Sequence, residues 1–274
     1  MNISIPLNFG PVTGFRVGHA PIGKPLMTVI CYRVDDVLID TGPRNARRQV
    51  LKLVGPESLR GIYLTHYHED HAGNAGYLQE RFDIPVYGHA LTAEMLKQKI
   101  KLKPYEHYMW GVLDRVRVLP LDNYFTTENY RFEIIHTPGH SHDHVIFWEK
   151  NQGWLFSGDM YLGARIKYFR SDEDIYQTVA SLKAIAALNF DILFCGHNPQ
   201  LVEPVKAIQR KIDHLENIIG QVRQLHESGL PPQEILRRAV QGRESWLARL
   251  ITLGDVSYRH MVLSALRGLP SNDA

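Results

Sequence analysis

The chain has 274 residues, enough for one large domain with an appendage or for two ordinary domains. Its 31 basic and 29 acidic side chains leave a formal charge of +2, which excludes the strong basic excess of a general nucleic-acid binder. Apolar, aromatic and charged fractions near the globular average exclude a disordered or fibrous chain. Composition therefore predicts a folded globular protein.

Residues 1–10 lack the basic start and continuous apolar stretch of a secretory signal. No run of about 18 apolar residues is present, so no membrane span is expected. Cys31 and Cys195 are too few for a disulfide framework and form no C-x-x-C pair, so we expect two buried thiols. The default expectation is a cytoplasmic protein without a membrane partner.

The first 200 residues alternate short apolar runs with single helical patterns, starting with a hairpin over residues 27–39 whose turn is at Asp35-Asp36. Further strands are expected at residues 61–65, 84–87, 132–136, 145–148, 154–156 and 192–194, and helices at residues 74–82 and about 172–188. Ser171 and Asp174 fit a capping box for the second of these helices. This alternation predicts a layered α/β domain.

From Pro204 onward the pattern changes to apolar residues at alternating three- and four-residue steps. This spacing predicts one long helix, closed by the Gly-Leu-Pro-Pro of residues 229–232. Shorter helical patterns follow at residues 233–240, 245–253 and 258–266. We therefore expect a catalytic domain over residues 1–203 and a helical extension over residues 204–274.

A dense group of metal-ligand residues follows the strand expected at residues 61–65. Residues 65–71 read Thr-His-Tyr-His-Glu-Asp-His and place His66, His68, Asp70 and His71 within six positions. These side chains cannot share one face of a regular element, but a loop can wrap them around a cation. Imidazole and carboxylate donors suit zinc, and less selectively iron or manganese.

Three more potential ligands, His140, Asp159 and His197, each follow an expected strand and stand beside glycine or near proline. The carboxyl ends of strands in open α/β sheets are where ligands collect. A lone histidine is usually an ordinary hydrogen-bonded group, but seven positions in this pattern are hard to explain in that way. A purely structural zinc site is disfavoured because cysteine is absent from the pattern.

From the Asp40-Thr41-Gly42 turn to His197, the chain resembles the metallo-β-lactamase superfamily over about its first 200 residues. The resemblance implies an αββα sandwich with a C-terminal helical extension and two divalent metal ions, zinc first. It implies one ion held by His66, His68 and His140, a second held by Asp70, His71 and His197, and Asp159 bridging both. A hydroxide shared by two such ions attacks the substrate, and we assign Asp70 to orient it, so Asp70 and Asp159 are the expected catalytic residues.

Residues outside this set have less specific signals. We expect Asp40, Asp143 and His144 to hydrogen-bond behind the ligands. The segment after Asp159 carries side chains that fit either an anionic-substrate rim or an ordinary solvated loop: Tyr161, Arg165, Lys167, Tyr168 and Arg170. The lysine-rich stretch of residues 97–110 fits a solvated helix end better than a substrate lid.

The leading functional hypothesis is hydrolysis of an ester-like bond, a thioester or a lactone, in a small molecule. An endoribonuclease or phosphodiesterase acting on RNA is the second, because residues 137–144 and the helical tail resemble that branch. Ten basic and eight acidic side chains in residues 203–274 make the tail too balanced for strong phosphate binding. A mononuclear-iron persulfide dioxygenase and a non-catalytic binding protein remain open, as does a homo-oligomer formed through the C-terminal helices.

Overall fold

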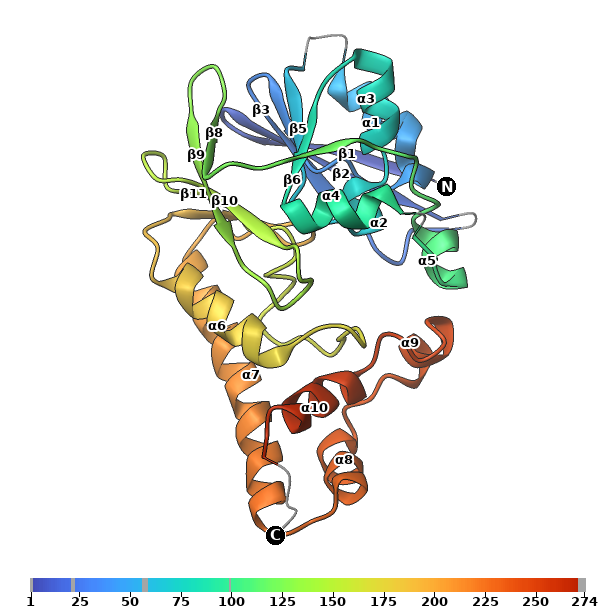
Figure 1. The fold of residues 1–274 in the computed structure, drawn as a ribbon, viewed down its shortest axis with the longest axis vertical. Coiled ribbons are helices and arrows are strands. Elements are labelled where there is room, and N and C mark those ends of the chain that lie inside the picture. The colour runs from blue at the N-terminus through green and yellow to red at the C-terminus, as the bar shows by residue number, and fades with distance from the viewer. Residues whose placement is uncertain (1, 21–22, 56–58, 99, 271–274) are drawn as a thin grey trace.

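The computed structural model describes residues 2–20, 23–55, 59–98 and 100–270. Figure 1 shows an upper body of strands flanked by helices and a lower body built from helices alone. One sheet contains β1 (Asn2–Phe9), β2 (Val12–His19), β3 (Val29–Val34), β4 (Val37–Ile39), β5 (Gly61–Tyr63), β6 (Val86–Gly88) and β7 (Val118–Pro120) in that order. The other has the order β12-β11-β10-β9-β8, with β8 (Tyr124–Thr126), β9 (Arg131–His136), β10 (Val145–Glu149), β11 (Trp154–Phe156) and β12 (Ile192–Phe194).

Helices cover the outer face of each sheet and build the lower body. In chain order they are η1 (Arg44–Ala46), α1 (Arg47–Val54), α2 (Glu69–Ala72), α3 (Ala75–Phe82), α4 (Ala90–Lys97), α5 (Pro104–Met109), α6 (Ile175–Ala186), α7 (Pro204–Glu227), α8 (Pro232–Val240), α9 (Trp246–Ile251) and α10 (Tyr258–Arg267). Strands β4 to β7 run parallel to one another, as do β11 and β12, so several strands deliver their carboxyl ends to one edge.

Three hydrophobic clusters hold the layers together. One lies between the sheets and includes Tyr32, Phe132 and Phe156. A second packs α1, α3 and α4 on the first sheet, and a third packs α6, α7, α8 and α10 on the second sheet. These clusters define the expected αββα sandwich with its C-terminal helical extension.

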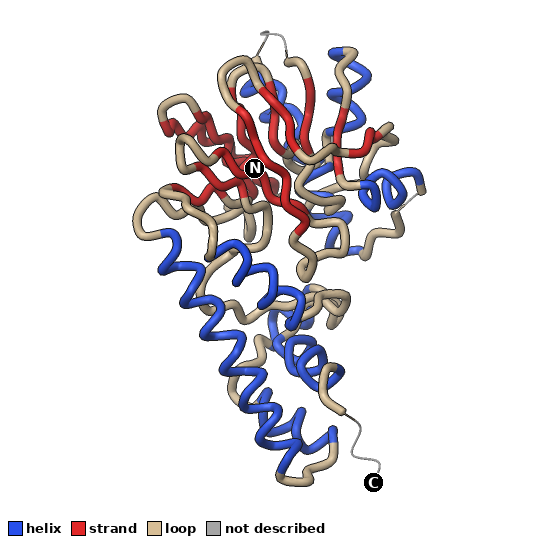
Figure 2. Tube along the Cα trace, turned by 60° about the vertical axis from the view of Figure 1, so that its left-hand side comes forward, coloured by secondary structure: helices blue, strands red, loops and turns tan. Residues whose placement is uncertain are grey.

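The helical extension shares its core with the sandwich. Ile208 and Val262 belong to the same buried cluster as Leu193 of β12. Figure 2 shows the helices of the lower part running up against the strands. The extension begins where the sequence predicted, at Pro204, and the division of the chain into two domains at residue 203 stays a prediction.

The predicted strands and long helices are present, and β7, β8, α1 and α4 occur where no element was predicted. Three further differences have local causes. The hairpin of β1 and β2 was not predicted, because Pro6 and polar residues interrupt its pattern; proline is tolerated there because β1 is an edge strand. Helix α6 is capped by Asp174 itself, whose carboxylate accepts bonds from the next turn, so the expected capping box beginning at Ser171 is wrong. Residues 69–72 form the short helix α2 where a loop was expected.

Two other expectations concern burial and membranes. Cys31 and Cys195 are both free and buried, as predicted. In the described part of the chain, none of the helices combines the length and the apolar run needed to cross a bilayer.

Candidate metal centre

Three histidines from two separate loops form a first group of donor atoms. His66 and His68 follow β5, and His140 lies in the loop between β9 and β10. Nδ1 of His68 lies 3.0 Å from Nε2 of His66 and 3.0 Å from Nε2 of His140. All three side chains are buried, so one small cation between them could take all three nitrogens.

A second group contains Asp70 and His71 on α2, Asp159 after β11 and His197 after β12. Nε2 of His71 lies 3.1 Å from Oδ1 of Asp159, and Nε2 of His197 lies 3.5 Å from Oδ2 of Asp70. Oδ2 of Asp159 lies 3.4 Å from His197 and also 3.6 Å from Nε2 of His140, which belongs to the first group. Asp159 therefore stands between the two groups.

The separations between the donor atoms agree with coordination of divalent cations. Zn–N distances of about 2.0–2.1 Å in a tetrahedron put neighbouring donors about 3.3 Å apart, close to the separations found here. Nε2 of His71, Nε2 of His197 and Oδ1 of Asp159 are buried and have no hydrogen-bond partner among the described residues. Buried polar atoms are rarely left in this state unless an ion or a water satisfies them. The donor set thus has the composition and spacing of a metal-binding centre.

Glycine at two positions leaves room for these donors. A Cβ at Gly196 would lie 2.6 Å from Oδ1 of Asp159 and 2.7 Å from Cε1 of His71. A Cβ at Gly158, whose φ is +47°, would lie 2.6 Å from Nε2 of His144. Side chains at these two positions would collide with the site, which explains why both ligand-bearing turns contain glycine.

Asp40 braces the metal loop from behind, as the sequence led us to expect. Its Oδ1 accepts a bond from the Thr65 backbone N–H at 2.8 Å, and its Oδ2 accepts one from the Thr65 hydroxyl at 2.8 Å. The same Oδ2 lies 2.7 Å from Nδ1 of His71. Asp40 thereby favours the tautomer that leaves Nε2 of His71 as a free electron-pair donor.

Asp143 and His144 also lie behind the ligands. Nε2 of His144 accepts a bond from the backbone N–H of Asp159 at 3.1 Å, while its Nδ1 lies 2.9 Å from the Thr137 hydroxyl. Asp143 accepts bonds from Thr92 at 2.7 Å and from Ser141 at 2.6 Å, next to His140. His144 orients Asp159 directly, whereas Asp143 fixes the loop that carries His140.

The electrostatics of the second group favour bound positive charge. Burial opposes protonation of His197, but Asp159 and Asp70 outweigh it and raise the pKa of its imidazole to about 10. Burial likewise opposes ionisation of Asp159, yet His197 and His71 hold its pKa well below the usual range. In the first group, burial and then the neighbouring histidine charges lower the pKa of His66 well below its usual value. The ionised carboxylates of the second group thus hold a proton on His197 at neutral pH, and a metal ion that binds there would displace this proton.

A family model described as the metallo-beta-lactamase superfamily matches residues 23–197, from before β3 through the last donor. The chain belongs to this superfamily. A Beta-lactamase-like protein 2 homolog from Drosophila melanogaster is 31% identical over 192 residues, which cover 65% of this chain and 60% of that protein. A Hydroxyacylglutathione hydrolase from Bdellovibrio bacteriovorus is 28% identical over 141 residues, which cover 51% of this chain and 49% of that protein. Each match spans less than two thirds of the relative's own length.

The likeness in fold extends beyond the matched domain. A metallo-beta-lactamase family protein of solved structure from Thermus thermophilus superposes with a TM-score of 0.64. The superposition covers 97% of this chain and 93% of that chain at 20% identity. At this identity it shows the shared fold alone, and its coverage includes residues of the helical extension.

The segment after Asp159 carries the four residues for which the sequence left open a substrate rim or a solvated loop. Tyr161 is buried in the hydrophobic cluster under the second sheet, and Tyr168 is exposed. Arg165 and Lys167 line a cavity against the helical extension whose described lining contains none of the seven metal-ligand candidates. Substrate binding by these four residues therefore stays a prediction. Among the described residues, no hydrogen bond or ion pair joins them to the metal-ligand candidates.

Arg170 is not a rim residue, because its side chain is 19% exposed and surrounded by carboxylates. Its guanidinium lies 2.8 Å from Glu106 of α5, 4.0 Å from Glu69 beside the ligand Asp70, and 3.5 Å from Asp172. Glu69 and Glu106 are both buried, and burial together with Asp70 raises the pKa of Glu69 to about 7. Arg170 therefore neutralises a buried acidic pair next to the metal loop.

The segment of residues 97–110 contacts the helical extension through two side chains. Lys103 forms an ion pair with Asp255, and the Tyr105 hydroxyl donates to the same carboxylate. Lys97 and Lys101 are exposed, as a solvated helix end requires, and Lys99 lies outside the described residues. These contacts place α5 against the extension.

The contact of Glu173 with His140 was not predicted from the sequence. Its Oε2 lies 3.4 Å from Nδ1 of His140, opposite the nitrogen that faces the first group, and its Oε1 accepts a bond from the Arg170 backbone. It therefore supports His140 as Asp40 supports His71. Its local sequence carries no signal for this role, because the contact joins two separate loops.

We expect Asp40→Asn to weaken metal binding by about 10- to 100-fold, the usual effect of losing a carboxylate behind a histidine ligand. Asparagine tolerates the left-handed backbone at this position, where φ is 58°, so the substitution tests the carboxylate and not the turn. Competition with a chromogenic chelator measures the change. An unaltered affinity would contradict the bracing role.

Lys211 of α7 gives the extension a pH-dependent contact with the loop that follows Asp159. Its buried ammonium donates to the Met160 carbonyl, and burial, opposed by Glu173 and Asp159, lowers its pKa from 10.5 to about 8. Between these two pH values the unfolded chain holds more protons than the folded one, so the free energy of unfolding rises with pH, by roughly 1 to 3 kcal/mol.

Urea unfolding between pH 8 and pH 10 tests this rise. We expect Lys211→Met to abolish it and Lys206→Met, at an exposed position on the same helix, to retain it. The expectation fails if both variants show the wild-type slope.

Proposed function

We propose that this protein is a hydrolase that uses two divalent metal ions, zinc by preference, to cleave an ester-like bond in a small molecule. A thioester is the first candidate and a lactone the second. The observation that carries the proposal is the position of Asp159, whose two carboxylate oxygens face donor atoms of both histidine groups. A site with seven donors in two adjoining groups suits a pair of ions better than a single ion.

The first group, His66, His68 and His140, would hold one ion, and Asp70, His71 and His197 would hold the other. When bound, such ions lower the pKa of water and polarise a carbonyl oxygen, which is the chemistry that ester hydrolysis needs at neutral pH. Asp70 would accept a hydrogen bond from the attacking oxygen and thus orient it. Asp40, His144 and Glu173 fix the ligand rings and carboxylates, so little reorganisation is needed during the reaction.

The choice of a thioester is supported by the relatives. One of them is named Hydroxyacylglutathione hydrolase, a hydrolase of acylated glutathione by its name, although its match spans 49% of its length. The RNA alternative gains no comparable support, because the described extension presents both signs of charge and carries ion pairs such as Glu234 with Arg237. We therefore place small thioesters before phosphodiesters.

A substrate panel on zinc-loaded and manganese-loaded protein tests the proposal. It contains thioesters, lactones, phosphodiesters and RNA, with His68→Ala as the inactive variant and His107→Ala, at an exposed position, as the matched control. We expect thioester turnover that His68→Ala abolishes and His107→Ala retains. Turnover of RNA alone, or one iron per chain with consumption of oxygen, would contradict the proposal.

A further inference from the structure

A cavity of about 710 Å³ lies between the segment that leads into α6 and the helices of the extension. Its walls come from residues 164–167, from one face of α7, from the turn after α8 and from the start of α10. Figure 1 shows α10 below the segment that enters α6, with α7 running down alongside. Its size falls within the range of small-molecule sites, about 300–1,000 Å³.

The cavity is strongly basic for a chain with a formal charge of only +2. Four permanent cations line it, Arg165, Lys167, Arg210 and Arg243, against the single carboxylate of Asp213. Four positive charges less one negative charge leave +3 within this concave surface. Like charges gathered in a concavity focus the potential and attract anions.

Three of these cations form no ion pair in the part of the chain that the structure describes. Within the described ranges, no ion pair involves Arg165, Lys167 or Arg210, whereas arginines elsewhere, such as Arg47, are paired. Asp213 instead accepts a bond from Gln209 at 2.8 Å. The cations therefore retain their full donor capacity for a ligand.

Other wall residues are fixed and supply a defined shape. The Arg243 guanidinium donates to Gln221 at 2.8 Å and to the Tyr258 hydroxyl at 3.2 Å, which holds it at the rim. Nε2 of His214 lies 3.2 Å from the Ile166 carbonyl and ties α7 to the segment above it. Ile218 is buried at the base and gives the cavity an apolar surface beside its charges.

We propose that this cavity binds a small phosphorylated organic anion at a site separate from the metal centre. A phosphate monoester carries about −1.5 to −2 charges and three acceptor oxygens, which match a group of guanidinium and ammonium donors. A single carboxylate has too little charge to balance the cavity, and inorganic phosphate is too small to fill it. The inference does not depend on which bond the metal centre hydrolyses.

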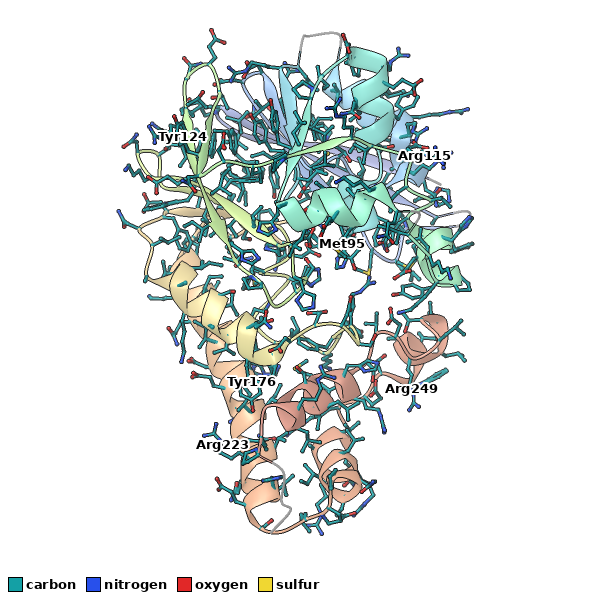
Figure 3. All side chains as sticks on the ribbon, viewed as in Figure 1. Met95, Arg115, Tyr124, Tyr176, Arg223 and Arg249 are labelled. Atoms are coloured by element: carbon teal, nitrogen blue, oxygen red, sulfur yellow. The ribbon has the colours of Figure 1, made fainter. Side chains whose placement is uncertain are left out.

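Isothermal titration calorimetry with ribose 5-phosphate as the probe tests the site. We expect saturable binding that weakens with salt, at least about tenfold weaker binding in Arg210→Gln and in the double variant Arg165→Gln with Lys167→Gln, and little binding of ribose or glutarate. Arg223→Gln is the matched control, because Arg223 lies on the same helix at an exposed position outside the cavity and is labelled on α7 in Figure 3.

Two further measurements separate this cavity from other anion sites. Asp159→Asn, which alters the metal centre, should bind ribose 5-phosphate with wild-type affinity, since no metal-ligand candidate lines the cavity. Thermal melting of each variant confirms that it is folded. Equal affinity in wild type and the double variant, loss of binding in Asp159→Asn, or displacement by a short RNA that binds much more tightly than the probe would each overturn the proposal.

Discussion

Asp159→Asn is expected to reduce bound metal from two ions per chain to one or fewer and to lower kcat/KM by about 10³-fold or more. Asparagine keeps the size of aspartate but loses its charge and one acceptor oxygen. Both oxygens are needed, because Oδ1 lies 3.1 Å from His71 and Oδ2 lies 3.6 Å from His140, in different donor groups. The backbone N–H of residue 159 can still donate to His144, so the turn itself should persist.

Metal content by atomic emission and thioester turnover measure the two effects separately. Asp122→Asn, at an exposed position between β7 and β8 that belongs to neither donor group, controls for the loss of one negative charge. Two tightly bound ions in Asp159→Asn would show that this carboxylate does not bridge. If Asp159→Asn loses metal but the wild type shows no thioester turnover, the metal centre is supported and the proposed reaction is rejected.

The seven candidate ligands could be predicted from the sequence because their signal is local. His66 to His71 are contiguous, and the other three donors each follow an apolar run that is itself recognisable as a strand. Once parallel strands pair, their carboxyl ends reach one edge of the sheet, so convergence follows from topology. Asp40 was predictable for the same reason, since β4 ends beside β5.

The surroundings of the ligands could not be predicted because they depend on contacts between distant segments. Arg165 and Arg170 are five residues apart in one segment, yet the first lines an open cavity and the second is partly buried among carboxylates. Local pattern gives both residues the same exposed, basic appearance. Only the docking of α5 and of the extension onto this segment distinguishes them.

The first residue of helix α6 could not be predicted for the same reason. Ser171 and Asp174 have the spacing of a capping box, but the Ser171 hydroxyl donates to Asp255 of the extension, 3.1 Å away. Arg170 also pairs through its backbone with Val256. These tertiary contacts hold residues 170 and 171 in the connection before the helix, which starts after Asp174.

Arg170→Met is expected to lower the free energy of unfolding by about 3 to 5 kcal/mol, the usual cost of breaking a buried ion pair from one side. Methionine keeps much of the aliphatic bulk but leaves Glu106 and Glu69 buried without a counter-charge. Glu69 is 2% exposed and Glu106 is 3% exposed, so neither can recover its hydration without movement of α5 or α2. Because α2 carries Asp70 and His71, the same movement should also weaken binding of the second metal ion.

Urea unfolding of the metal-loaded protein measures the destabilisation, and Lys167→Met provides a control from the same segment, where the side chain is exposed and makes no ion pair among the described residues. Adding Glu106→Gln to Arg170→Met should recover part of the loss, since it removes the nearer of the two stranded charges. A purely steric role for Arg170 predicts no such recovery. Rescue by the second substitution therefore decides whether charge neutralisation beside the metal loop is what this arginine contributes.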